Sequence, residues 1–139
     1  PVTSADFFPT IMEMADLPEL AGVDGESLVP LIRQSGALER ESIFWHYPHY
    51  SNQGGEPGGA IRRGNYKLIE FYRDGKLELY DLSDDIGEEN NLAEQIPNRA
   101  RQLHQSLRKW RVDVGATMPK ENPDYDPAQS DQGLTGAQR

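Results

Sequence analysis

The sequence predicts an α+β fold, in which a small antiparallel sheet of three to four strands is packed by a long C-terminal helix. Three observations support this class. Residues 60–82 alternate apolar and polar side chains between turn dipeptides, residues 97–115 carry one apolar stripe, and residues 4–16 form a shorter apolar stretch. Period-two patterns are typical of half-buried strands, and spacings of three and four are typical of helices.

The first expected element is a helix from about residue 4 to residue 16. Thr3 or Ser4 is a candidate N-cap, and Pro9 lies near the first turn, where a missing N–H costs little. The apolar positions at helical spacing are Phe7, Phe8, Ile11, Met12 and Ala15. This stripe predicts a buried face, and so apolar a helix needs a partner to pack against. A loop then leads into a short apolar turn over residues 28–32.

The expected strands follow. Residues 43–47 form a candidate strand that Pro48 ends, and residues 51–59 have the Gly-rich composition of a flexible loop. Residues 64–65 predict a first turn, and residues 74–75 are the Asp-Gly dipeptide that a two-residue type I′ hairpin favours. The side chains expected on one face of the sheet are Ile69, Phe71 and Tyr80, and those expected on the other are Tyr72, Leu77 and Leu79.

The last expected element is the long helix, with Pro97 at its first position and Gly115 as its stop. Its apolar stripe consists of Ala100, Leu103, Leu107, Trp110 and Val114. Each large apolar side chain buried contributes roughly 1.5–3 kcal/mol, enough to hold the helix on the sheet. His104 lies beside the stripe and is expected to be structural or exposed. After Asn122 the periodicity is lost, which predicts a loose tail.

Composition narrows the classes of partner. The chain has 139 residues and a formal net charge of −9, which disfavours nucleic acid as the main partner because phosphate binding needs a basic face. No apolar run is long enough to cross a bilayer, so we expect no membrane partner. Residues 60–76 are basic, whereas residues 81–94 carry acidic and no basic side chains. This segregation indicates either two solvated loop faces or a basic stretch that meets an anionic ligand.

A search for a self-contained catalytic motif finds none. The chain has no Cys, no His-Glu-x-x-His helix, no phosphate-binding Gly loop and no dinucleotide-binding fingerprint. His46 and His49 lie three positions apart around Pro48, an odd offset that sends strand side chains to opposite faces unless the proline bend redirects one. A His-His metal site is therefore disfavoured. The acidic run over residues 81–90 does not have the ligand spacing of a calcium-binding EF-hand loop.

Several motifs do carry a resemblance to a known family. SADFFPTIMEMADLP and DGESLVPLI, followed by FWHYPHY, AIRRGNYKLIEFY and LELYDLSDDIGEENNLAEQIP, resemble in content and order the end of a type I sulfatase. The nearest pattern is that of bacterial arylsulfatase-like and N-acetylgalactosamine-6-sulfatase-like enzymes of the alkaline-phosphatase superfamily. The resemblance implies three parts: residues 1–40 as the terminal segment of an α/β catalytic domain, residues 41–118 as the C-terminal subdomain, and residues 119–139 as a loose tail. The first helix would then belong to the missing catalytic domain.

The resemblance also implies the chemistry of a parent enzyme. Such enzymes hydrolyse aryl or carbohydrate sulfate esters with a formylglycine, made from Cys or Ser in a Cys/Ser-x-Pro-x-Arg motif, and with a calcium ion bound by Asp and Asn. The chain contains neither Cys nor Ser-x-Pro-x-Arg, so no catalytic residue and no metal ligand can be assigned to it. We therefore expect an inactive C-terminal fragment whose partner is the missing N-terminal catalytic domain. Family habit predicts a periplasmic or secreted parent.

The candidate substrate-contacting residues lie in two short stretches. We expect His46, Tyr47 and His49, together with Arg62 or Arg63, to line the mouth of the active-site pocket, since aromatic faces suit sugar or aryl rings and His or Arg can donate to sulfate oxygens. The alternative is that the aromatic residues are strand core and the arginines pair with acidic neighbours. Two other functions stay open: a fragment of a related phosphodiesterase or phosphatase, and a stand-alone carbohydrate-binding module.

Overall fold

The computed structural model divides the chain into two compact units, Pro1–Ile43 and Phe44–Arg139. The residues that the structure describes are 1–18, 21–51, 55–120 and 122–124. Each unit is described by itself. Within the described residues, no helix is both long and apolar enough to cross a membrane.

The smaller unit is helical. Its elements are a 3-10 helix η1 (Ser4–Asp6), the helix α1 (Phe7–Met14) and the short helix α2 (Val29–Ile32). The expected first helix is thus confirmed. The expected burial of its apolar stripe is wrong for this chain, because Phe7 is 60% exposed and Ile11 is 63% exposed. Leu31 and Ile32 of α2 are themselves 40% and 62% exposed, so they do not cover that face.

A polar cluster closes the smaller unit instead of an apolar core. The carboxylate of Asp6 is fully buried and accepts hydrogen bonds from the Arg40 guanidinium, at 2.6 and 2.7 Å, and from the backbone N–H groups of Thr3 and Glu26. The Arg40 guanidinium holds the pKa of Asp6 well below its usual range. The Thr10 hydroxyl donates to the Asp6 carbonyl at 2.6 Å. These contacts join the start of α1 to two loops that are distant in the sequence.

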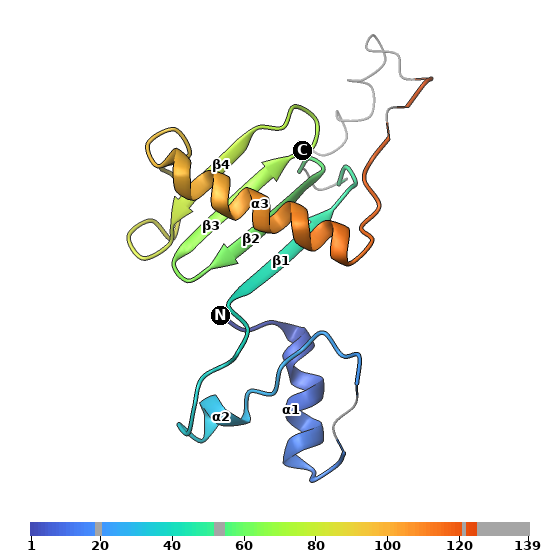
Figure 1. Cartoon of the computed structure of the whole chain (residues 1–139), viewed down its shortest axis with the longest axis vertical. Helices are drawn as coiled ribbons and strands as arrows, with labels where there is room; N and C mark the ends of the chain where they lie inside the picture. Colours follow the sequence, from blue (N-terminus) through green and yellow to red (C-terminus); the bar gives the residue numbers. More distant parts are fainter. Residues whose placement is uncertain (19–20, 52–54, 121, 125–139) are drawn as a thin grey trace, which may run out of the picture. The chain divides into compact units, whose positions relative to one another are not determined.

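The larger unit contains the sheet and the long helix (Figure 1). The strands are β1 (Ser42–Tyr47), β2 (Gly58–Arg63), β3 (Tyr66–Phe71) and β4 (Leu77–Asp81), in the spatial order β1-β2-β3-β4. β2 pairs antiparallel with β3, and β3 with β4, which puts Ile61, Leu68 and Leu79 in one cross-strand row. α3 (Pro97–Asp113) crosses the face that carries this row. The expected α+β fold is confirmed.

The two turns of the sheet differ from each other. Residues 64–65 join β2 to β3, as expected, and Gly64 takes a φ of 58° that suits glycine. The expected two-residue type I′ turn at residues 74–75 is wrong. β3 ends at Phe71 and β4 begins at Leu77, and a hydrogen bond of 2.9 Å from the Gly75 N–H to the Phe71 carbonyl closes a wider loop. Only Gly75 of the dipeptide has a positive φ, whereas a type I′ turn needs two.

The core of the larger unit lies between α3 and the sheet. The fully or almost fully buried residues that form it are Ile61, Leu68, Leu79, Ala100, Leu103 and Leu107. Trp110 stacks on Phe44 with ring centroids 4.9 Å apart, which joins the end of α3 to β1. The expected burial of Val114 is wrong, since it is 55% exposed. Four residues after Leu107, the buried position is taken by Arg111, and α3 ends before Val114 can follow the stripe.

Candidate functional site

A groove of about 480 Å³ lies on the sheet in the larger unit. Trp45 and Tyr47 of β1 line it and stay 46% and 51% exposed. Ile69 and Phe71 line it from β3, on the far side of β2. Residues two apart on a strand point to the same side, and the core residue Leu68 points to the other side, toward α3. The groove is therefore on the face that α3 leaves uncovered, and Trp45, Tyr47 and Phe71 contribute aromatic rings to its walls.

The central strand supplies the hollow between these walls. Gly58 and Ala60 of β2 line the groove and have little or no side chain to fill it. A Cβ atom at residue 58 would lie 2.9 Å from the carbonyl oxygen of Glu70 on the paired strand, so this position excludes larger residues. The groove thus forms because small residues on β2 lie between large residues on the neighbouring strands β1 and β3.

Among the described residues, one cation of the groove has no counter-ion. Lys67, directly opposite Arg62 in the β2–β3 register, contacts both carboxylate oxygens of Glu88 at 2.6 and 2.7 Å. Arg62 makes a long hydrogen bond of 3.4 Å from Nε to the Gly64 carbonyl, and it has no ion pair within the described part of the chain. The groove therefore combines apolar rings with one cation that can meet an anion.

His46 lies on the other face of β1, away from this groove. Its Nδ1 is 2.6 Å from the Tyr72 hydroxyl oxygen, and its Nε2 is 2.9 Å from the carbonyl oxygen of Thr117, which follows α3. The Phe44 ring, two residues earlier, stacks under α3. His46 therefore connects β1 to Tyr72 and to the end of the long helix rather than facing an open pocket.

The other candidate residues occupy different positions. His49, beyond β1, contacts Tyr47 edge-on with ring centroids 5.6 Å apart, so these two residues lie together. Arg63 points to the face of the core residue Ile61, and it takes part in an interaction of its own. The structure thus brings Tyr47, His49 and Arg62 toward the groove side and separates His46 and Arg63 from them.

A buried charged cluster lies beside His46, under α3. Arg111 is 8% exposed, and its Nη2 is 2.7 Å from Glu70 on β3. Glu70 also contacts Nε2 of His104 at 3.0 Å. The Arg111 guanidinium lies over the ring of Tyr72, 5.1 Å from its centroid. Burial raises the pKa of the Tyr72 hydroxyl, which therefore stays protonated at neutral pH.

None of these clusters has the ligand set of a metal site. Among the described residues, no three His, Asp or Glu side chains gather as a cation site would require. Hard cations such as calcium need six or more oxygen ligands. The calcium ion that the resemblance implies is expected to be bound by another part of the parent polypeptide, so no chemical step is assigned through it here.

Comparison with known proteins gives the family. The family model described as N-sulphoglucosamine sulphohydrolase, C-terminal, matches residues 1–113, most of the chain. The chain belongs to this family of sulfatase C-terminal regions. It is 31% identical to a sulfatase of Formosa agariphila over 80% of the chain, and 33% identical to arylsulfatase K of Danio rerio over 78%. These matches cover 23% and 21% of the relatives, so the chain spans about a fifth to a quarter of their length.

A solved structure extends this likeness to three dimensions. The structure of a protein bound to its substrate, D-glucosamine-2-N,6-O-disulfate, matches 84% of this chain and 25% of its own, with a TM-score of 0.69 and 27% identity. The four-stranded antiparallel sheet packed by a C-terminal helix matches the sulfatase C-terminal subdomain. This arrangement agrees with the fold that the motifs in residues 4–97 imply.

Sequence reasoning missed the buried cluster of Glu70, Tyr72 and Arg111. Two signals were available. Arg111 continues the 100, 103, 107 spacing of the buried helical stripe, and Glu70 and Tyr72 follow Leu68 at the even spacing of the buried strand face. Charged residues at core positions predict a buried ion pair, because an unpaired buried charge is costly. For sulfatase C-terminal regions, such positions merit the same attention as exposed aromatic residues.

Proposed function

We propose that this chain is the C-terminal part of an enzyme that hydrolyses sulfate esters of carbohydrates or aryl compounds, and that it binds substrate rather than breaking the ester bond. The match of the sulfatase C-terminal family to residues 1–113 carries the proposal. The absence of Cys from the whole chain supports the second half, since formylglycine cannot arise here from a cysteine. The nucleophile and the calcium ligands would come from another part of the polypeptide.

The groove on the uncovered sheet face is the surface we propose for substrate contact. Tyr47 and Trp45 offer ring faces to a sugar or aryl group, and Arg62 offers N–H donors to a sulfate or carboxylate. His49, which contacts Tyr47, adds an imidazole at the same edge. His46 and Arg63 remain in the proposed site as residues that support it from the other face of the sheet. A relative named N-acetylglucosamine-6-O-sulfatase and the disulfated glucosamine of the solved structure favour a carbohydrate sulfate.

The smaller unit offers the proposed contact with the catalytic part. Phe7, Ile11 and Met14 recur along α1 and are 60%, 63% and 67% exposed. A second pocket of about 310 Å³ in this unit is lined in part by Phe8 and Leu17. Exposed apolar surface of this kind marks a protein contact. The occupant we propose is the preceding catalytic domain of the same polypeptide, because the relatives are about four times longer than the matched region.

We also propose that the parent is periplasmic or secreted, as the family habit favours. Fractionation of the source cells, followed by detection of the chain with an antibody, checks this. Recovery of the parent in the cytoplasm alone would contradict it.

The central experiment compares the chain with its parent polypeptide. The parent is expected to release sulfate from a glucosamine 6-sulfate or a nitrophenyl sulfate, whereas the chain alone is expected to release none above the buffer rate. The matched pair of variants in the parent is Arg62→Ala and Arg108→Ala, since Arg108 is exposed on α3 and away from the groove. Arg62→Ala should raise KM for the sulfated sugar about tenfold, the loss of one charge-assisted hydrogen bond.

Two results would contradict the proposal in different ways. Ester hydrolysis by the chain alone would place the chemistry in these residues. Equal KM values for Arg62→Ala and Arg108→Ala would remove the groove from the substrate site while leaving the family assignment intact. Calorimetric binding of sulfated oligosaccharides by the chain, together with no sulfate release by the parent, would favour a free carbohydrate-binding module.

A further inference from the structure

The imidazole of His46 is engaged at both nitrogens, and this fixes where its proton lies. Nε2 is 2.9 Å from the carbonyl oxygen of Thr117, which can only accept a hydrogen bond. Nε2 therefore carries the proton and donates. In the neutral ring Nδ1 is then an acceptor, and it receives the hydroxyl proton of Tyr72 across 2.6 Å. The geometry selects the Nε2–H tautomer.

Tyr72 reaches His46 because β2 leaves room for its hydroxyl group. A Cβ atom at Gly59 would overlap the Tyr72 hydroxyl oxygen, so any larger residue at this position would displace it. The φ angle of Gly59 is not in the left-handed region, and its backbone conformation does not require glycine. Glycine here therefore leaves space for Tyr72, and it also relieves a close approach to the Trp45 carbonyl oxygen, 3.2 Å from such a Cβ. The Tyr72 and His46 rings also contact each other, with centroids 5.4 Å apart.

Arg111 and Glu70 hold Tyr72 from the helix side. The Arg111 guanidinium covers the Tyr72 ring, and its Nη2 contacts Glu70 at 2.7 Å. Nη1 of Arg111 is buried and has no hydrogen-bond partner within the described residues. Unsatisfied buried polar atoms are uncommon, and apolar residues of similar size often give equal or greater stability than a buried ion pair. Stability alone therefore does not account for a charged residue at this position.

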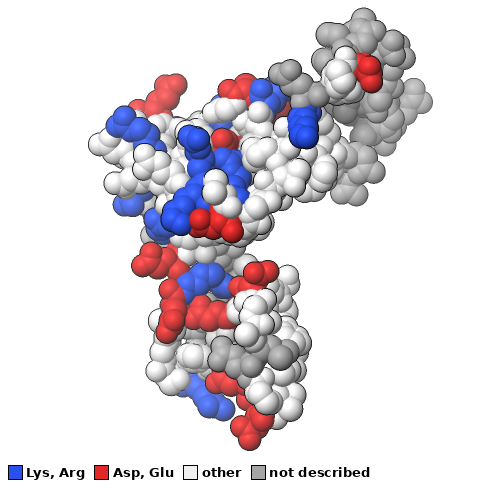
Figure 2. Space-filling view, turned by 45° about the vertical axis from the view of Figure 1, so that its right-hand side comes forward, with Lys and Arg blue, Asp and Glu red and all other residues white. Residues whose placement is uncertain are grey.

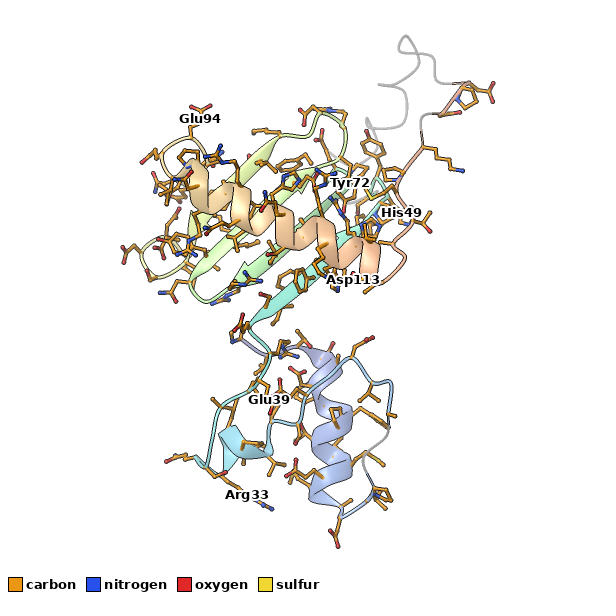
Figure 3. The ribbon with its side chains drawn as sticks, in the orientation of Figure 1. Arg33, Glu39, His49, Tyr72, Glu94 and Asp113 are labelled. Carbon is orange, nitrogen blue, oxygen red and sulfur yellow. The ribbon has the colours of Figure 1, made fainter. Side chains whose placement is uncertain are left out.

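These contacts form one network, which joins segments that are distant in the sequence. It runs from Glu70 on β3 through Arg111 on α3 and Tyr72 to His46 on β1, and then to Thr117 after α3. Tyr72 and His49 both lie at the end of the sheet near the C-terminal end of α3 (Figure 3). The residue after His46 is Tyr47, which faces the groove. The network therefore anchors the strand that carries the proposed substrate contacts.

We propose that Tyr72 and Arg111 are positioning residues, which hold the ring of His46 by a hydrogen bond to its unprotonated Nδ1 and through it fasten β1 and the segment at Thr117 into one arrangement. His46 then acts by orienting its neighbours Tyr47 and His49, and it does not bind the substrate itself. The link to substrate rests on the proposed function. The state of His46 is a property of the chain alone and can be tested without activity.

The first experiment measures the tautomer of His46 by nitrogen-15 NMR of the imidazoles in the full chain. The wild type is expected to show a protonated Nε2 and a bare Nδ1 for His46. Tyr72→Phe, which removes only the hydroxyl, should shift the Nδ1 resonance because Nδ1 loses its hydrogen bond, while the Thr117 carbonyl keeps the proton on Nε2. The matched control is Tyr50→Phe, which makes the same change at a side chain that is 66% exposed and should leave the His46 signals unchanged.

A second variant tests the same contact without removing any polar group. Gly59→Ala should displace the Tyr72 hydroxyl and reproduce the altered His46 spectrum. Amide dispersion of each variant shows whether the fold persists. A wild-type spectrum with the proton on Nδ1 would overturn the proposal whatever the variants do. An unchanged His46 spectrum in a folded Tyr72→Phe protein would overturn it as well.

The last experiment tests the link to substrate in the parent polypeptide. Tyr72→Phe is expected to raise KM for a sulfated glucosamine about fivefold, the loss of one hydrogen bond, with kcat changed less. Arg111→Lys should give a smaller rise, because lysine keeps the charge opposite Glu70 but cannot cover the ring. If Tyr72→Phe alters the His46 spectrum but leaves KM unchanged, the positioning role is overturned while the proposed function stands. If the wild-type parent hydrolyses no sulfate ester, the proposed function fails and the tautomer result is unaffected.

Discussion

The two units of this chain are held together by different kinds of contact. The larger unit has a closed apolar core, in which Ile61, Leu68 and Leu79 of three strands lie under two leucines of α3. In the smaller unit, two of the buried residues are polar, Asp6 and Thr10, while Phe7, Ile11 and Met14 of α1 are exposed. Acidic and basic side chains lie close together on its surface (Figure 2).

This difference in buried side chains indicates which unit has a core of its own to stabilise its fold. Burial of apolar side chains such as leucine and isoleucine supplies the main favourable free energy in folding. Among the described residues, only the larger unit has a continuous core of such side chains. In the smaller unit, a buried ion pair fixes the geometry of the loops but contributes little net stability compared with an apolar core. Its exposed apolar helix is consistent with a segment that is completed by another part of a longer polypeptide.

The largest expected effect is the loss of a core leucine. Leu107 is fully buried between α3 and the sheet, so Leu107→Ala should lower the free energy of unfolding of the larger unit by about 3–4 kcal/mol. Both tryptophans of the chain, Trp45 and Trp110, lie in this unit, so their fluorescence in a urea titration reports it alone. The matched control is Val112→Ala on the same helix, where the side chain is 80% exposed and the change should stay within about 0.5 kcal/mol. Equal losses for the two variants would contradict the core described here.

A somewhat smaller effect is expected from the polar cluster of the smaller unit. Asp6→Asn leaves the Arg40 guanidinium without its counter-ion and should lower the free energy of opening of this unit by about 3 kcal/mol. Hydrogen exchange of the Leu28 N–H, which donates to the Thr10 hydroxyl at 2.8 Å, measures that opening. Asp24→Asn, at an exposed carboxylate, is the control and should leave the exchange rate unchanged. Protection of Leu28 that survives Asp6→Asn would show that the cluster does not close the unit.

Acid should release the same cluster gradually. The Arg40 guanidinium keeps the pKa of Asp6 below that of an unfolded chain, which is about 3.9. The stabilisation is therefore complete above about pH 5 and is lost as the pH falls below 4 toward the pKa of the folded state. Exchange at Leu28 should accelerate over that interval relative to its intrinsic rate, and the gap between wild type and Asp6→Asn should close. A gap that stays constant from pH 6 to pH 2 would contradict the assigned cause.

The fold of the larger unit could be predicted because its pattern is local. Alternation along β3 and β4, the turn at residues 64–65, and Pro97 and Gly115 at the ends of the helix depend on neighbours in the sequence. The wider turn at residues 72–76 could not be predicted from Asp-Gly alone. Phe71 N–H donates to the Lys76 carbonyl at 3.0 Å, and that pairing spans six residues.

The candidate site could be predicted only in part, because side-chain direction depends on which face α3 covers. The odd offset of His46 and His49 indicated opposite faces, but the sequence did not show which face held the groove. The hydrogen bond from His46 to Thr117 joins residues 71 positions apart in the sequence, and no local pattern indicates it. The ion pair of Asp6 with Arg40 is of the same kind, at a separation of 34.

The smallest effect on this chain is expected at the exposed face of α1. The same change in the parent polypeptide tests whether this face of the smaller unit is covered there. Ile11 is 63% exposed, so Ile11→Ser should change the free energy of opening of the smaller unit by no more than about 0.5 kcal/mol. In the parent polypeptide the same change would place a hydroxyl group in an apolar contact, and the free energy of unfolding should fall by about 2 kcal/mol. Thermal unfolding of the parent and hydrogen exchange of the chain measure the two quantities. The same substitution is measured in both proteins, so the effect in the chain is the control for the effect in the parent. Equally small effects in the two proteins would show that α1 faces solvent in the parent too.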